Sequence, residues 1–135
     1  MQNKSTVLEM TSYSITSFKY EKNKNFEPKE KNIQIPIDFQ TGFKKVDEDN
    51  LVAEFAVNIA DEEKFPFFLN LVLQSGFRSS KWETNVNQVE VTIASILFPY
   101  VRALITSLTA TAGEQPIMLP VMNVAEMIKN QQKTK

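Results

Sequence analysis

The sequence predicts a single α+β domain over residues 1–135, with an antiparallel sheet and helices packed on one side of it. A chain of 135 residues is long enough for one sizeable core but not for two. Its first part contains segments in which every second residue is apolar, the pattern of a half-buried strand. Its last part contains apolar residues at helical spacing, so strands come first and helices last.

The first two segments are predicted to be extended, with a loop between them. Residues 5–20 are rich in Ser, Thr and aromatic residues and alternate imperfectly, which predicts a long edge strand. Residues 20–32 are polar and contain Pro28, which predicts an exposed connection. Within it, Phe26 is either a singly exposed aromatic residue or the anchor of a loop that folds back over a sheet. Residues 33–39 alternate strictly, but Pro36 limits them to an edge strand or an extended loop, and residues 41–50 are predicted to form a turn-rich connection.

Two later segments alternate more clearly. Residues 51–60 and residues 65–74 each place five apolar side chains on one face. Phe68 and Val72 lie on the opposite face of the second segment, which is therefore apolar on both sides. Gly76 predicts a bulge or bend, and residues 77–91 hold a weak signal for a fourth strand. The inward residues are Leu51, Ala53, Phe55, Val57 and Ile59 in the first segment and Phe65, Phe67, Leu69, Leu71 and Leu73 in the second.

Two helices are predicted in the last third of the chain. A long helix ends at Gly113, a natural stop. Pro99 has two explanations: it stands in the first turn of a helix that starts near Ser95, or it kinks a helix that starts near Val89. A short helix follows Asn123, a favourable N-cap with a glutamate three residues later. The apolar stripes are Ile93, Ile96, Leu97, Tyr100, Val101, Leu104, Ile105 and Leu108 in the long helix and Val124, Met127 and Ile128 in the short one.

The residue inventory argues against an enzyme, a metal site and a bound cofactor. The chain has no cysteine and no histidine, so it lacks a zinc site of the Cys/His type, a cysteine nucleophile and a histidine base. Its three glycines are isolated, which excludes a glycine-rich phosphate loop. A formal net charge of −1 gives no attraction to nucleic acid or to an anionic membrane. Without an apolar run of signal-peptide length, the sequence predicts a cytoplasmic protein.

Residues 96–108, "ILFPYVRALITSL", resemble the helix signature of the SecB family of protein-export chaperones, I-L-F-P-Y-A-R-x-x-I-T-S-M. Four shorter stretches are similar to that family in the same order: "FEP" at residues 26–28, the alternating isoleucines of residues 33–37, "LVLQSGF" at residues 71–77 and "IMLPVMNV" at residues 117–124. The resemblance covers nearly the whole chain and is most specific in the helix. It implies a four-stranded antiparallel sheet with a crossover loop after strand 1 and two C-terminal helices.

The resemblance also implies a function, an ATP-independent chaperone that binds unfolded or partly disordered polypeptides in apolar grooves and assembles as a homodimer or a dimer of dimers. Such a groove gains about 1.5–3 kcal/mol for each apolar side chain it buries. Positions that align with the family's acidic contacts to the translocase motor SecA hold Ile15, Lys19 and Leu71, and the C-terminal tail is basic, so docking to SecA is doubtful. The implied groove residues are Phe26, Ile33, Ile35, Ile37, Phe68, Met127 and Ile128, and the implied oligomer interface is Ile96, Tyr100, Leu104 and Leu108.

Two other functions are open at this point. One is an adaptor or assembly protein on the same fold, with closed grooves and one dedicated folded partner. The other is a small-molecule binder that uses apolar space between the sheet and the helices. Exposure of the isoleucines in residues 33–37 and of Phe68 distinguishes a groove from an adaptor, because a groove needs accessible apolar side chains.

Overall fold

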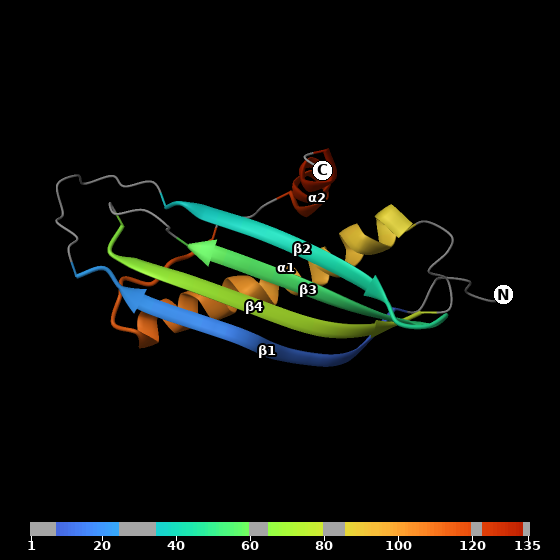
Figure 1. The fold of residues 1–135 in the computed structure, drawn as a ribbon, viewed down its shortest axis with the longest axis horizontal. Helices are drawn as coiled ribbons and strands as arrows, with labels where there is room; N and C mark the ends of the chain where they lie inside the picture. The colour runs from blue at the N-terminus through green and yellow to red at the C-terminus, as the bar shows by residue number, and fades with distance from the viewer. Residues whose placement is uncertain (1–7, 25–34, 60–64, 80–85, 120–122, 134–135) are drawn as a thin grey trace. The chain divides into compact units, whose positions relative to one another are not determined.

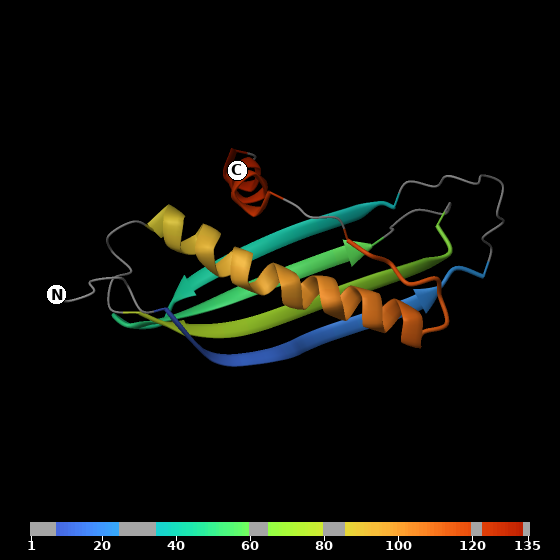
Figure 2. The same ribbon diagram turned by 180° about the vertical axis from the view of Figure 1, so that it is seen from behind.

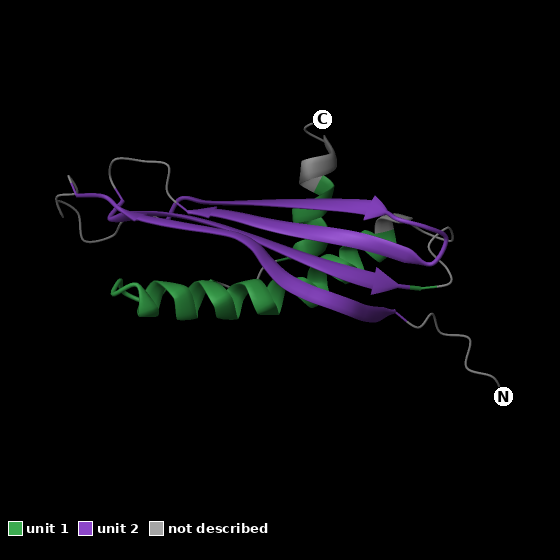
Figure 3. Cartoon of the chain, turned by 60° about the horizontal axis from the view of Figure 1, so that its bottom comes forward, with its two compact units in different colours: residues 1–7, 79–135 green, residues 8–78 purple. Residues whose placement is uncertain are grey.

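The structure is a computed structural model that describes residues 8–24, 35–59, 65–79, 86–119 and 123–133. Its elements in order are β1 (Glu9–Lys22), β2 (Ile37–Lys45), β3 (Asn50–Ile59), β4 (Phe67–Arg78), α1 (Val86–Thr111) and α2 (Val124–Lys133) (Figure 1). The chain forms two compact units, Leu8–Arg78 with the strands, and Ser79–Lys135 with the helices together with residues 1–7 (Figure 3). A single domain over residues 1–135 stays a prediction.

The four strands form one antiparallel sheet in the order β1-β4-β3-β2. The hairpin between β2 and β3 is closed by Asp47, whose Oδ1 accepts the backbone N–H groups of Asp49 and Asn50 at 2.9 Å each. Because β1 and β2 follow each other in sequence but lie at opposite edges, the chain crosses from one edge of the sheet to the other between them. This order confirms the predicted crossover connection after the first strand.

The central strands confirm the alternation seen in the sequence. On β3, the five predicted inward residues are 0–7% exposed, and on β4 the inward residues from Phe67 to Phe77 are 0–3% exposed. We call this buried side of the sheet the inner face, and the opposite side the outer face. Phe55 lies across from Leu73, and Val57 from Leu71, so the best-buried residues of the two strands meet in the middle of the inner face.

Strand β2 is longer toward its C-terminal end than predicted. Residues 41–45, expected in a turn-rich connection, continue the strand in regular register with β3. The physical reason is Phe43, which lies half-buried on the inner face opposite Ala53 and extends the apolar pattern of Ile37 and Phe39. The strand begins at Ile37, directly after Pro36, whose missing N–H favours a strand end.

The further strand predicted in residues 77–91 is not found in residues 77–79 and 86–91, the part of this stretch that the structure describes. Phe77 and Arg78 are the last residues of β4, and Val86 already begins α1. The apolar residues at the end of β4 and at the start of α1 together gave the weak strand signal, because short apolar runs do not distinguish a strand from a helix.

Strand β1 carries two β-bulges, which explain its imperfect alternation. Its register against β4 shifts between Met10 and Ser12 and again between Ile15 and Ser17. Thr11 and Thr16 are therefore extra residues with no opposite residue of their own. Side chains of an ordinary strand return to the same face every second residue, and each extra residue lengthens one such step to three. The large apolar side chains on one face of β1 are therefore separated by three, two, three and two positions along the sequence. They are Met10, Tyr13, Ile15, Phe18 and Tyr20, and all lie across from inner-face residues of β4.

The predicted bulge near Gly76 lies on the neighbouring strand instead. Gly76 belongs to β4 and lies opposite Ser12, beside the bulge at Thr11. A Cβ atom at Gly76 would come within 2.8 Å of the Thr11 hydroxyl oxygen, so the bulged chain occupies the space that a side chain would need. Ser75 also joins β4 to β1 beside this bulge, because its hydroxyl donates to the Ser12 carbonyl oxygen at 2.8 Å.

Helix α1 is continuous through Pro99 (Figure 2). The helix begins at Val86, so the explanation that places Pro99 inside a helix is confirmed and the explanation that places it in the first turn is wrong. Pro99 has no N–H for the carbonyl of Ser95, four residues earlier. Just before this point the hydroxyl of Ser95 donates to the carbonyl of Val91 at 2.8 Å, an arrangement that favours bending of a helix. The buried stripe of α1 is Ile93, Ala94, Leu97, Phe98, Val101, Ile105 and Thr109.

Both helices are capped as the sequence predicts. Gly113 has a φ of 90°, and its N–H donates to Ala110 at 3.1 Å while the N–H of Glu114 donates to Thr109 at 3.0 Å. This pair of bonds is the Schellman arrangement that favours glycine at the helix end. At the start of α2, the Asn123 Oδ1 accepts the N–H of Glu126 at 3.0 Å, which confirms the predicted N-cap.

The connection after α1 is fastened to the helix by two threonines. The Thr109 hydroxyl accepts the N–H of Ile117 at 3.0 Å, and the Thr106 hydroxyl donates to the Ile117 carbonyl at 2.7 Å. Both backbone groups of one loop residue are thus satisfied by side chains of the last turns of α1. Ile117 and Leu119 are buried, whereas Met118 between them is 73% exposed.

Candidate functional site

The apolar side chains of the inner face extend beyond its buried centre to both edge strands, where they are partly exposed. Tyr13, Ile15 and Phe18 on the edge strand β1 are 39–43% exposed, although they lie on the same face as the fully buried leucines of β4. At the other edge, Phe39 and Phe43 of β2 are half-buried. A run of large apolar side chains left in contact with water is typical of a surface that binds another chain.

Two predicted groove residues lie where β2 begins. Ile35 is 39% exposed just before the strand, and Ile37 is half-buried on the inner face opposite Ile59. They therefore continue the apolar edge formed by Phe39 and Phe43. Phe26 and Ile33, the other two predicted groove residues of this connection, lie outside the described residues.

Phe68 lies on the other side of the sheet. It is half-buried on β4 between the buried inner-face residues Phe67 and Leu69, so its own side chain belongs to the outer face. The structure therefore does not bring Phe68 together with Ile37, although both were predicted to line one groove. On the outer face, the Asn70 side-chain amide donates to the Asn58 side-chain oxygen across β3 and β4.

The predicted groove residues of α2 differ in accessibility. Met127 is half-buried and Ile128 is 3% exposed, as is typical of a short helix that buries one stripe. Val124, one turn before Ile128, is also buried. Within the helical unit α2 contacts α1. Met127 is thus the residue of this pair that a ligand could reach, because Ile128 is buried.

The four predicted interface residues of α1 form a second stripe beside its buried one. Ile96, Leu104 and Leu108 are half-buried, and Tyr100 is 42% exposed. Their spacing of four residues places them along one side of the helix. By length and composition alone, Gln88–Thr111 is long and apolar enough to cross a membrane, and the core helix of a soluble protein meets the same criteria.

No group of three or more Asp and Glu side chains in the described part of the chain could hold a metal ion. One ion pair joins two strands: Arg78 pairs with Glu9 at 2.7 Å between β4 and β1, and this hydrogen bond raises the pKa of the Arg78 guanidinium. The carboxyl of Asp47 has a lowered pKa, mainly because it accepts the N–H of Asp49.

Sequence reasoning missed the β1 row of Tyr13, Ile15 and Phe18 as a candidate binding surface. The signal was present, because aromatic and β-branched residues recur along this strand with small polar residues between them. A search for apolar residues at every second position does not find this row, because each bulge adds one residue between successive members of the row.

Comparison with known proteins agrees with this fold. The sequence model of the family described as preprotein translocase subunit SecB matches residues 3–135. An uncharacterised protein of Methanocaldococcus jannaschii is 28% identical over 136 residues, which is 95% of this chain and 86% of that protein. The protein-export protein SecB of Anaplasma phagocytophilum is 35% identical over 75 residues, covering 51% of this chain and 48% of that protein.

Two solved structures share the architecture. A SecB-like chaperone of Mycobacterium tuberculosis, solved in complex with a ChAD peptide from the HigA1 antitoxin, superposes with a TM-score of 0.67 at 13% identity, covering 85% of this chain and 90% of that one. A Streptococcus agalactiae protein of unknown function gives a TM-score of 0.58 at 13% identity, covering 87% of this chain and 99% of that one. With the family match over almost its full length and a four-stranded antiparallel sheet followed by two helices, the chain belongs to the SecB family.

Proposed function

We propose that this protein binds unfolded or partly disordered polypeptides through apolar surface, as a cytoplasmic chaperone that uses no nucleotide and catalyses no reaction. The observation that carries the proposal is the row of Tyr13, Ile15 and Phe18, three large apolar side chains about 40% exposed on an edge strand. The complex of a SecB-like chaperone with an antitoxin peptide supports it, since that relative shares the fold and binds a polypeptide.

The binding surface in this proposal has two parts on the sheet. One is the β1 row, and the other is the β2 edge with Ile35 and Ile37; the predicted position Ile33 is two residues before Ile35 in the sequence, and Phe26 is nine residues before it. The remaining predicted residues, Phe68 on the outer face and Met127 with Ile128 on α2, are secondary positions. Flexible or aromatic side chains suit such a role, because they adapt to client side chains of varied shape.

Suppression of aggregation of a denatured client by the purified protein tests the proposal. The wild type should suppress aggregation when present in excess, and Ile15→Ser combined with Phe18→Ser should lose most of this effect, because two exposed apolar contacts are removed. Val46→Ser is the matched control, since Val46 is 59% exposed on the β2–β3 turn, away from both surfaces. Suppression that is absent in the wild type, or unchanged in the double variant, contradicts the proposal.

We further propose that α1 lies at a homo-oligomer interface through Ile96, Tyr100, Leu104 and Leu108. Light scattering should give a dimer or a dimer of dimers for the wild type. Leu104→Glu should lower the mass toward that of the monomer, because an uncompensated charge in an apolar interface is costly. Ala110→Glu, which adds the same charge at an exposed position of α1, should keep the wild-type mass.

A further inference from the structure

Two of the three glycines in the chain have a structural reason, and the described residues show none for the third. Gly113 has the positive φ of a helix end, and Gly76 makes room for the bulge of β1. Gly42 lies in the middle of β2, where the register with β3 is regular and φ is not in the left-handed region. A Cβ atom built on Gly42 would meet nothing within 4 Å.

A glycine in a strand interior has a cost, because it orders a flexible backbone and packs no side chain. Where bulge and bend are absent, the remaining reason is the close approach of a ligand or another backbone. Gly42 therefore suggests that a ligand or another polypeptide backbone lies over this part of the outer face.

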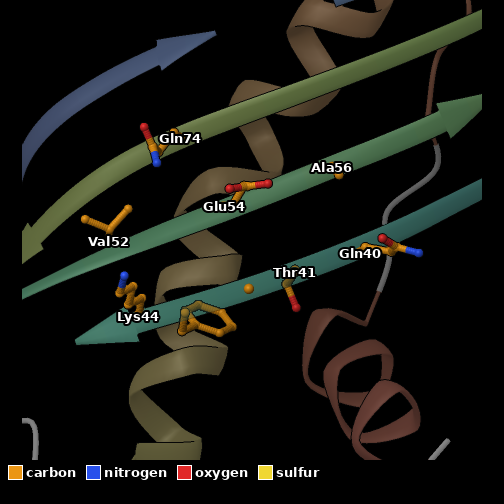
Figure 4. A pocket seen from close by; sticks show the side chains of 9 residues that line it. Gln40, Thr41, Lys44, Val52, Glu54, Ala56 and Gln74 are labelled. Atoms are coloured by element: carbon orange, nitrogen blue, oxygen red, sulfur yellow. The ribbon is translucent and has the colours of Figure 1, made fainter. Parts of the chain in front are cut away.

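A hollow of about 350 Å³ opens above Gly42 on the same face (Figure 4). Glu54 lies directly across from Gly42 on β3, and Gln74 lies across from Glu54 on β4. Gln40 and Lys44 precede and follow Gly42 by two residues, so their side chains share its face. Val52 and Ala56 are the half-buried apolar residues of the hollow.

The four polar side chains around this hollow make no hydrogen bond or ion pair with one another or with any other residue that the structure describes. They are Gln40, Lys44, Glu54 and Gln74. Elsewhere on the sheet, Glu9 pairs with Arg78 and Asn58 pairs with Asn70, whereas Lys19, Glu21 and Asp38 are exposed and have no partner among the described residues. Two amides, one ammonium and one carboxylate around an open space can hydrogen-bond a peptide backbone and pair with two opposite charges.

From these observations we propose that the hollow over Gly42 is a second polypeptide site, specific for a short extended segment with an acidic and a basic residue two positions apart. Lys44 and Glu54 are diagonal cross-strand neighbours, so their Cβ atoms lie roughly 7 Å apart. Side chains two apart in an extended peptide share one face and are also roughly 7 Å apart. The acidic residue of the ligand pairs with Lys44, the basic residue pairs with Glu54, and the residue between them lies over the space beside Gly42, which has no side chain to fill it.

This site is distinct from the apolar surface of the proposed chaperone function. It lies on the outer face, whereas the β1 row and the β2 edge lie on the inner face. Its volume suits two or three residues of a partner, and its open shape predicts affinities in the millimolar range for an isolated tripeptide.

The test is a titration of the full-length protein, followed by backbone amide resonances, with the capped tripeptides Ac-Asp-Ala-Lys-NH2 and Ac-Ala-Asp-Lys-NH2. The two peptides have the same composition, but only the first places both charges on one face of an extended chain. We expect the first peptide to shift resonances of residues 40–44 and 52–56 and to bind at least about tenfold more tightly than the second. Equal binding of the two peptides, or no shift with either, overturns the proposal.

Gly42→Val provides the structural control, because it adds a branched side chain to the floor of the hollow at a position where a Cβ atom meets nothing within 4 Å. It should abolish the shifts while leaving the fold intact, whereas Ser17→Val, on the outer face of β1, should leave binding unchanged. Lys44→Met and Glu54→Gln, both at exposed positions, should each weaken binding about tenfold. Binding that survives in Gly42→Val contradicts the proposal, and the two charge variants decide the question even if the valine variant does not fold.

Discussion

A Cβ atom on Gly76 would lie 2.6 Å from the hydroxyl oxygen of Ser12 on the neighbouring strand. The hydroxyl groups of Thr11 and Ser12, at the β1 bulge, therefore take up the space that a side chain at Gly76 would need.

Gly76→Ala should accordingly destabilise the protein. We expect the free energy of unfolding, measured in urea, to fall by about 1–3 kcal/mol, because the new methyl group overlaps two hydroxyl oxygens. Gly42→Ala is the matched control, because its methyl group meets nothing, and it should leave stability equal or raise it by up to about 1 kcal/mol. Equal effects of the two substitutions would show that the contact between Gly76 and Ser12 does not matter.

Thr109→Val should loosen the connection after α1. The valine has nearly the same shape but cannot accept the N–H of Ile117, which would then be buried without a partner, at a cost of about 1–3 kcal/mol. Amide hydrogen exchange at Ile117 should become faster, and the unfolding free energy should fall. Thr109→Ser keeps the hydroxyl and should restore slow exchange at Ile117. Slow exchange in the valine variant would argue against the hydrogen bond.

Asn123→Ala should destabilise α2 at its N-terminus. Loss of an N-cap side chain costs typically about 0.5–2 kcal/mol, so exchange of the α2 amides should accelerate by up to roughly 30-fold. Asn123→Asp is the control, since a carboxylate accepts the same bond from Glu126 and suits the positive end of the helix. The expectation fails if alanine and aspartate at this position give the same exchange rates.

Asp47 makes the β2–β3 hairpin sensitive to acid. Its folded-state pKa is lowered, first by the N–H of Asp49 and then by the side-chain amide of Asn50. A lowered pKa means that the ionised group stabilises the fold above its unfolded pKa of about 4, and that this contribution disappears as pH falls through the lower folded value.

The measurement is the melting temperature of wild type and Asp47→Ala as a function of pH. The wild type should melt a few degrees higher at pH 7. The difference should shrink below about pH 4, as the carboxylate takes up a proton. Glu48→Ala, one residue further along the turn, should have the melting temperature of the wild type both at pH 7 and below about pH 4. A difference that stays constant with pH would contradict a role for the charge of Asp47.

Most of the fold could be predicted from the sequence, because the central strands obey simple rules. The inward rows of β3 and β4 alternate without interruption, and the cap at Asn123 and the stop at Gly113 use residues with a clear local preference. The end of β2 could not be predicted, since Thr41 and Gly42 have turn composition and only pairing with β3 makes them a strand.

The candidate site was predicted less well, because it depends on which face each side chain occupies. Phe68 and Ile37 were grouped by likeness to a family, and alternation along β4 and β2 then placed them on opposite faces. Ile15 and Phe18 were not recognised as neighbours, since the bulge at Thr16 between them is set by pairing with β4 and not by local sequence preference.

The bulges of β1 also determine at which positions this strand can lose a single residue in evolution. Removal of Thr16 would leave Ile15 and Phe18 two positions apart, in the phase of an ordinary strand, with every other side chain still on its present face. Removal of Ser14, only two residues earlier, would turn the entire preceding segment over. Single-residue gaps between this chain and its relatives should therefore fall at Thr11 or Thr16, and a gap placed elsewhere in the strand marks an error of alignment.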